Sequence, residues 1–136
     1  MESTGSFLFV YGTLRQSAAG SLGKAQRERL ARESRSLGAA TMPGARLYDL
    51  GRYPGLVESA AASDVVHGEV VVLANPARTF RWLDAYEGVI AGDPEASDYA
   101  RIERAVMLQR GSEFSAWVYI FIKDVAHRRA IATGRW

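Results

Sequence analysis

The sequence predicts a single α+β domain built on a small mixed β-barrel with flanking helices, and three observations support this prediction. The chain has 136 residues, which leaves room for one domain over residues 1–136 at roughly 100–200 residues per domain. About five or six segments have strand-like patterns, and about two or three have helical patterns. These segments do not alternate regularly, so a closed or half-closed barrel is favoured over a doubly wound sheet.

The first half of the chain supplies a strand, a helix and two further extended pieces. Residues 7–11 favour β-structure and end at Gly12, which is typical of a short buried strand that ends in a turn. Residues 24–36 mix basic and acidic side chains around a thin apolar stripe, which predicts an exposed helix. Residues 45–50 are extended, and one proline and two glycines predict a loop at residues 51–57 before the next extended piece.

The middle of the chain carries the clearest strand and the best-defined helix. Residues 65–73 are rich in valine, and the His-Gly-Glu interruption within them predicts a bulge or a barrel edge. Asn75 is a good N-cap and Pro76 suits the first helical position. Gly88 supplies the stop, so a helix is expected between these two signals.

The last third predicts a loop followed by a β-hairpin. Residues 89–98 are rich in glycine, proline and aspartate and predict a loop. Residues 99–109 and 114–122 alternate apolar and polar side chains on either side of a turn at residues 110–112. The second strand would place Trp117 and Tyr119 on one face.

Composition excludes several classes of function. Lys and Arg number 17 and Asp and Glu 15, so the formal charge is only +2, which gives no electrostatic preference for nucleic acid or for a membrane surface. The longest apolar run, residues 116–122, is far shorter than the ~18 residues of a membrane span. The apolar residues 7–11 are preceded by the acidic Glu2 and by no basic residue, so no signal peptide is expected. A cytoplasmic protein is expected.

Residues suited to metal or nucleophilic catalysis are scarce. The chain has no cysteine, which excludes disulfides, thiolate ligands and a cysteine nucleophile. Its two histidines, His67 and His127, are 60 positions apart and lack zinc-site or serine-triad motifs. We therefore expect neither a metal nor a cofactor.

Two segments remain as candidates for chemistry. At Gly12 the chain leaves a strand, so consecutive backbone N–H groups can turn toward an anion, although most such sites are only turns. Glu87 lies in the last turn of the predicted helix, where its charge opposes the helix dipole. Such a carboxylate is either solvated and unimportant or has a raised pKa, which a general base near neutral pH requires.

Short segments in a specific order carry a resemblance to a known family. They are residues 11–15 (Tyr-Gly-Thr-Leu-Arg), 47–51, 53–57, 67–70, 83–88 (Leu-Asp-Ala-Tyr-Glu-Gly), 117–119, and Tyr99 with Arg101. In this order and spacing they resemble the γ-glutamylcyclotransferase-like family, which includes AIG2-like proteins and γ-glutamylamine cyclotransferases. The resemblance covers nearly the whole chain. One difference is Arg135, because the family often ends its core near Gly-Asp-Trp.

The resemblance implies a small β-barrel, a substrate cavity at the Tyr-Gly-Thr-Leu loop and Glu87 as the proton acceptor. The family's reaction releases an amine from a γ-glutamyl amine or adduct, because the substrate's own α-amine attacks the side-chain amide and closes 5-oxoproline. Nucleophile and electrophile share one molecule, so no cysteine, triad or cofactor is required. One glutamate can act first as base and then as acid.

The remaining site residues follow from that chemistry. The backbone N–H groups of Gly12, Thr13 and Leu14 are expected to hold the substrate α-carboxylate and the oxyanion, and Tyr11 adds a hydroxyl. Tyr119 has two interpretations, as a packed barrel aromatic or as a hydroxyl that reaches the cavity. Tyr53 and Tyr99 are interpreted as structural aromatics, and Arg15 as a solvated side chain.

Two other classes of function compete with an enzyme. A non-catalytic AIG2-like protein could keep the cavity for another small molecule, because fold does not dictate function. Nucleic-acid binding through the arginine-rich segment 24–36 would show a steep loss of affinity with salt. The favoured hypothesis is the enzyme, with a small γ-glutamyl substrate as its partner and neither nucleic acid nor a membrane.

Overall fold

A computed structural model describes residues 7–18 and 20–136 of the chain, so the expectation based on Glu2 lies outside the described residues. The helices and strands follow in this order: β1 Phe7–Val10, α1 Lys24–Glu33, β2 Ser34–Pro43, β3 Ala45–Asp49, β4 Pro54–Glu58, β5 Val65–Leu73, α2 Pro76–Glu87, β6 Tyr99–Leu108, β7 Glu113–Phe121 and β8 Arg129–Ile131.

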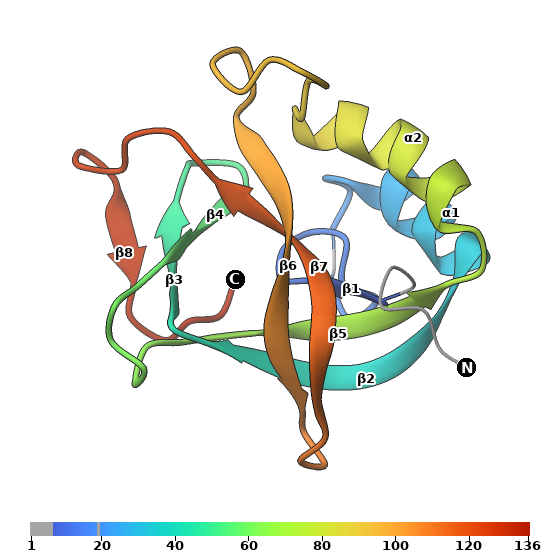
Figure 1. Cartoon of the computed structure of the whole chain (residues 1–136), viewed down its shortest axis with the longest axis horizontal. Coiled ribbons are helices and arrows are strands. Elements are labelled where there is room, and N and C mark those ends of the chain that lie inside the picture. The colour runs from blue at the N-terminus through green and yellow to red at the C-terminus, as the bar shows by residue number, and fades with distance from the viewer. Residues whose placement is uncertain (1–6, 19) are drawn as a thin grey trace.

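Five of the strands close into a barrel. Its order is β1-β5-β2-β6-β7, and β1 completes the circle by pairing in parallel with β7 through Leu8 and Trp117. The other ladders of the barrel are antiparallel. The predicted α+β fold with a mixed barrel is therefore confirmed. A separate three-stranded sheet, β4-β3-β8, stands on one side of the barrel, and α1 and α2 lie on the other (Figure 1).

Alternation along β1 creates two apolar cores. Phe9 points into the barrel, where it packs in a cluster with Val66 and Val118. Leu8 and Val10 point outward and pack in a second cluster with Phe80 and other side chains of the helical layer. Because successive strand residues face opposite sides, one short strand joins both cores. The cavity described below lies where β1 ends and these two cores meet.

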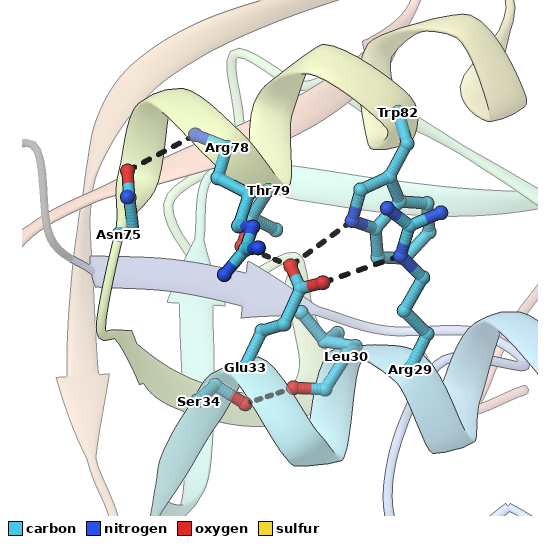
Figure 2. A network of polar contacts seen from close by, with 8 residues as sticks. All are labelled: Arg29, Leu30, Glu33, Ser34, Asn75, Arg78, Thr79 and Trp82. Carbon is cyan, nitrogen blue, oxygen red and sulfur yellow. Dashed lines mark hydrogen bonds and ion pairs between the residues drawn. The ribbon is translucent and has the colours of Figure 1, made fainter.

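Hydrogen bonds to Glu33, the last residue of α1, join the two helices (Figure 2). Its Oε1 accepts a hydrogen bond from the hydroxyl of Thr79 at 2.6 Å and one from the indole nitrogen of Trp82 at 3.0 Å. Its Oε2 pairs with Arg29 at 3.2 Å. Burial raises the pKa of Glu33, but these hydrogen bonds outweigh burial and hold the pKa below its usual value.

The first expected helix is shorter than its sequence pattern. It ends at Glu33 rather than at residue 36, and β2 follows without a loop. Arg35 therefore belongs to a strand that pairs with β5, and Ser34 ends the helix with a hydrogen bond from its hydroxyl to the Leu30 carbonyl. The long ladder between β2 and β5 determines this boundary, because strand pairing overrides local helix propensity.

Other expectations are corrected in detail. The strands β2 and β8 were not predicted, and the expected loop at 51–57 is shortened because β4 begins at Pro54. The bulge expected within β5 lies instead in β2, between Ser36 and Gly38. The first residues of β5 do extend beyond β1, and there the His67 N–H donates to the Gly134 carbonyl at 2.8 Å.

The later elements agree with the sequence patterns. The side chain of Asn75 caps α2 by accepting from the Arg78 N–H at 3.1 Å, and Gly88 ends the helix with φ 79°. This left-handed conformation favours glycine. The hairpin β6–β7 turns at the predicted residues 110–112, and residues 89–98 connect α2 to it without helix or strand. Neither helix of the described chain is long and apolar enough to cross a membrane.

Candidate functional site

A cavity of about 290 Å³ opens where β1 ends, between the last turn of α2 and the strands β6 and β7. All six residues that the sequence analysis selected for the site line it: Tyr11, Gly12, Thr13, Leu14, Glu87 and Tyr119. The fold therefore brings together residues that are up to 108 positions apart.

The loop after β1 presents free backbone N–H groups to this cavity. A turn closes it, because the Arg15 N–H and the Arg15 Nε both donate to the Gly12 carbonyl, at 3.2 and 3.0 Å. Within residues 7–18 and 20–136, no hydrogen bond occupies the N–H groups of Gly12, Thr13 or Leu14. A side chain at position 12 would press on the Pro54 ring at 3.1 Å. The loop therefore has the free backbone donors that an anion-binding turn needs, and a side chain at position 12 would fit only if Pro54 shifted.

Glu87 is the last residue of α2, and Gly88 turns the chain away from it. Its side chain is half-buried and lines the cavity. Among the described residues, no hydrogen bond or ion pair reaches its carboxylate. Burial, followed by the charge of Asp84, raises the pKa of Glu87 to about 7. The group can therefore both accept and donate a proton near neutral pH.

Tyrosines surround this carboxylate, since five of the six in the chain line the cavity: Tyr11, Tyr53, Tyr86, Tyr99 and Tyr119. The Tyr11 hydroxyl donates to the Tyr119 carbonyl at 2.6 Å and accepts from the Leu56 N–H at 3.4 Å. The Tyr99 hydroxyl donates to the Pro54 carbonyl at 2.9 Å. Burial raises the pKa of both phenols. The protons of these two phenols are engaged, so neither phenol is a free donor toward the cavity.

The sequence analysis missed a partly buried polar network beside Glu87. The Tyr119 hydroxyl donates to Asp84 Oδ1 at 2.7 Å. The Arg101 guanidinium binds the same carboxylate in bidentate fashion, at 2.8 and 3.1 Å. It also stacks over the rings of Phe80 and Trp117, at 3.8 and 4.6 Å. Tyr119 thus packs and lines the cavity, while its hydroxyl binds Asp84.

Two signals in the sequence point to this network. Asp84 lies one helical turn before Glu87, so both carboxylates share one face of α2. Arg101 lies directly opposite Tyr119 in the hairpin, a register that the turn at 110–112 implies. The interpretation of Tyr53 and Tyr99 as structural aromatics missed their place in the cavity wall, because both belong to its lining.

A second cavity, of about 450 Å³, lies on the other side of the loop and is lined by Arg15 among others. The carboxylate of Glu69 there accepts hydrogen bonds from the N–H groups of Gln16 and Ser17 and from the Ser17 hydroxyl. This acid anchors the loop and is not free for proton transfer. Nowhere in residues 7–18 and 20–136 do three His, Asp or Glu side chains gather as a metal site would require.

The chain is similar in sequence to known proteins. A family model described as gamma-glutamyl cyclotransferase, AIG2-like, matches residues 8–136. Over 129 residues, the chain is 30% identical to the gamma-glutamylcyclotransferase family protein YtfP of Escherichia coli. The alignment spans 95% of this chain and 94% of that protein.

Solved structures extend the comparison to the fold. The solution structure of ytfP from Escherichia coli matches with a TM-score of 0.61 over 96% of this chain and 95% of that one. The crystal structure of an AIG2-like protein from mouse matches with a TM-score of 0.68 at 19% identity, over 90% of this chain and 80% of that one. At that identity, the mouse protein supports the shared fold alone.

Proposed function

Because the chain belongs to the gamma-glutamyl cyclotransferase, AIG2-like family, we propose that it releases an amine from a γ-glutamyl amine or adduct by cyclisation to 5-oxoproline. The observation that carries this proposal is the carboxylate of Glu87. It lines a cavity without a polar partner among the described residues, has a pKa of about 7, and shares the cavity with three free N–H groups.

The proposed reaction balances within one substrate molecule. The substrate's α-ammonium gives a proton to Glu87, and the freed nitrogen attacks the carbonyl carbon of the γ-amide. A ring C–N bond forms, and the negative charge on oxygen is held by the N–H groups of Gly12, Thr13 and Leu14. When the carbonyl re-forms, the bond to the leaving nitrogen breaks and that nitrogen takes the proton from Glu87. The ring nitrogen still carries two hydrogens, and it gives one of them to the freed carboxylate of Glu87. Glu87 passes this second proton to the released amine, so the products are 5-oxoproline with one N–H and the amine as its ammonium ion. No water molecule is consumed.

The physical contribution of the protein is orientation and proton transfer. Well-oriented intramolecular reactions reach effective molarities of about 10⁵ M or more, so a cavity that holds the substrate curled supplies much of the acceleration. A positioned acid–base group adds about 10²- to 10⁴-fold. The proposal therefore needs no nucleophile from the chain.

The test is a panel of γ-glutamyl amines and γ-glutamyl amino acids, with 5-oxoproline and the released amine quantified together. We expect at least one member to give both products in equal amounts. If members of the panel bind but none yields 5-oxoproline, the protein is a small-molecule-binding AIG2-like protein, and the catalytic proposal is wrong. Glutamate in place of 5-oxoproline would indicate hydrolysis and would also contradict the proposal.

A further inference from the structure

The mouth of the cavity carries three large apolar side chains. Five residues that line the cavity are exposed, and three of them are large and apolar, which places them where the cavity opens to solvent: Leu22 at 38%, Tyr53 at 47% and Tyr86 at 42%. We call these three residues the rim. Large apolar side chains that stay exposed beside a cavity are typical of a binding surface.

The rim is assembled from three separate parts of the chain. Leu22 lies in the turn before α1, Tyr53 lies just before β4, and Tyr86 lies in the last turn of α2 beside the proton-accepting Glu87. Burial and the Glu87 charge raise the pKa of Tyr86, and a hydrogen bond with Thr13 partly offsets them. The rim is therefore continuous with the loop and with the carboxylate that carry the proposed reaction.

The size of the cavity determines what meets the rim. At about 290 Å³ it lies at the small end of the range for ligand sites, roughly 300–1,000 Å³. In the proposed reaction, the γ-glutamyl group occupies the inner end, where the N–H groups and Glu87 lie. A leaving amine larger than a few atoms must therefore extend outward to the rim.

Two charged side chains of opposite sign also lie at the mouth. Arg52 and Asp98 both line the cavity and are both exposed. Their charges offset each other, so charge at the mouth does not determine which amine binds there. The three rim side chains offer only apolar surface and two phenol groups.

We propose that the leaving amine carries an aromatic or long alkyl body, and that the rim binds this body. This inference rests on the proposed function. A phenyl group gains free energy when it moves from water onto an apolar surface. We therefore expect kcat/KM for an aromatic amine derivative to exceed that for a short alkyl amine derivative about 10-fold or more.

The experiment compares γ-glutamyl-phenethylamine with γ-glutamyl-ethylamine, which share charge and reacting atoms and differ in the phenyl ring. We expect kcat/KM for 5-oxoproline release to favour the aromatic substrate about 10-fold or more, mainly through KM. Equal values would overturn the inference while leaving the proposed function intact.

If no substrate is converted, measurements of binding affinity distinguish the proposal for the rim from the proposed function. The affinity of Glu87→Gln for the same pair, measured by calorimetry, should again differ about 10-fold or more. If the affinities differ in this way but the unsubstituted protein forms no 5-oxoproline, the proposed function is wrong and the role of the rim in binding still stands. Equal affinities would refute the rim.

Matched variants locate the preference. In Leu22→Ala and Tyr53→Ala, the ratio between the two substrates should fall several-fold, with folding checked by circular dichroism. Met107→Ala removes an equally exposed apolar side chain, 39% exposed, from the end of β6, outside the cavity lining. In Met107→Ala, the ratio of kcat/KM between the two substrates should match that of the unsubstituted protein. A similar fall in this control would contradict the assignment of the preference to the rim.

Discussion

Two glutamates at the ends of the two helices have opposite environments. Glu33 ends α1 and Glu87 ends α2, so each opposes the dipole of its own helix. Hydrogen bonds from Thr79, Trp82 and Arg29 surround Glu33, whereas none reaches Glu87 among the described residues. Burial raises both pKa values, but hydrogen bonds reverse its effect only at Glu33.

This difference distinguishes a carboxylate that is part of the structure from one that is suited to proton transfer. An acid whose oxygens are all engaged stabilises the junction of the helices and holds its charge. An acid that is desolvated and unengaged is destabilised when charged, so it exchanges protons near neutral pH. The same change, glutamate to glutamine, should therefore have opposite consequences at the two positions.

The largest expected effect is on activity. Glu87→Gln should lower kcat/KM for 5-oxoproline release by about 10²- to 10⁴-fold, because glutamine cannot take the α-ammonium proton. Glu33→Gln, measured well below its melting temperature, should stay within about 2-fold because Glu33 lies outside the cavity lining. A Glu87→Gln enzyme with unchanged kcat/KM would remove the catalytic assignment.

The second effect is a gain in stability from the same substitution. The pKa of Glu87 rises from 4.5 to about 7 on folding, so the charged carboxylate costs stability that is absent below pH 4.5 and complete above about pH 7. Glu87→Gln removes this cost and should raise the free energy of unfolding by roughly 1–3 kcal/mol at pH 8. Urea unfolding of both proteins at pH 8 and pH 4 measures this difference in the free energy of unfolding. A variant that is still the more stable protein at pH 4 would contradict this explanation.

The third effect has the opposite sign. Glu33→Gln should lower the free energy of unfolding at pH 7 by about 1–2 kcal/mol, because hydrogen bonds to a charged acceptor are stronger than those to a neutral amide. The folded pKa of Glu33 is lowered, so its contribution is present above the unfolded value of 4.5 and is lost as pH falls through the folded pKa. Melts of the two proteins should therefore converge in acid, whereas a constant gap would indicate a packing effect.

The comparison also shows what the sequence could predict. Glu87 could be selected because Gly88 marks the end of its helix and because several segments, in their order and spacing, resemble a known family. The structural role of Glu33 was not predicted, because its hydrogen bonds come from Thr79 and Trp82 of another helix, 46 and 49 positions away. A local pattern predicts where a side chain lies on its own element, but not which distant donors satisfy it.

The same reasoning explains the fold. The β6–β7 hairpin and α2 contain their own turn and cap residues, so their local sequence patterns were enough to predict them. The strand β2 has glycine, alanine and serine where a strand pattern needs apolar alternation, and its pairing with β5 on one side and β6 on the other fixes it in the barrel. The three residues of β8 are likewise defined by a partner, β3, about 80 positions earlier in the chain.

The smallest effect concerns the tuning of Glu87. The kcat/KM of the unsubstituted enzyme should rise with pH through a midpoint near 7, as Glu87 loses its proton. Burial is the larger cause of that pKa and the charge of Asp84 the smaller, so Asp84→Asn should move the midpoint toward lower pH without returning it to 4.5.

Asp98→Asn is the matched control for this shift. Asp98 also lines the cavity, but its charge does not contribute to the raised pKa of Glu87, so the midpoint of this variant should not move. Equal shifts in both variants would mean that the general field of the cavity, rather than Asp84, sets the proton affinity. An unmoved midpoint in Asp84→Asn would mean that Arg101, which binds the Asp84 carboxylate, already neutralises its charge, and that burial alone raises the pKa of Glu87.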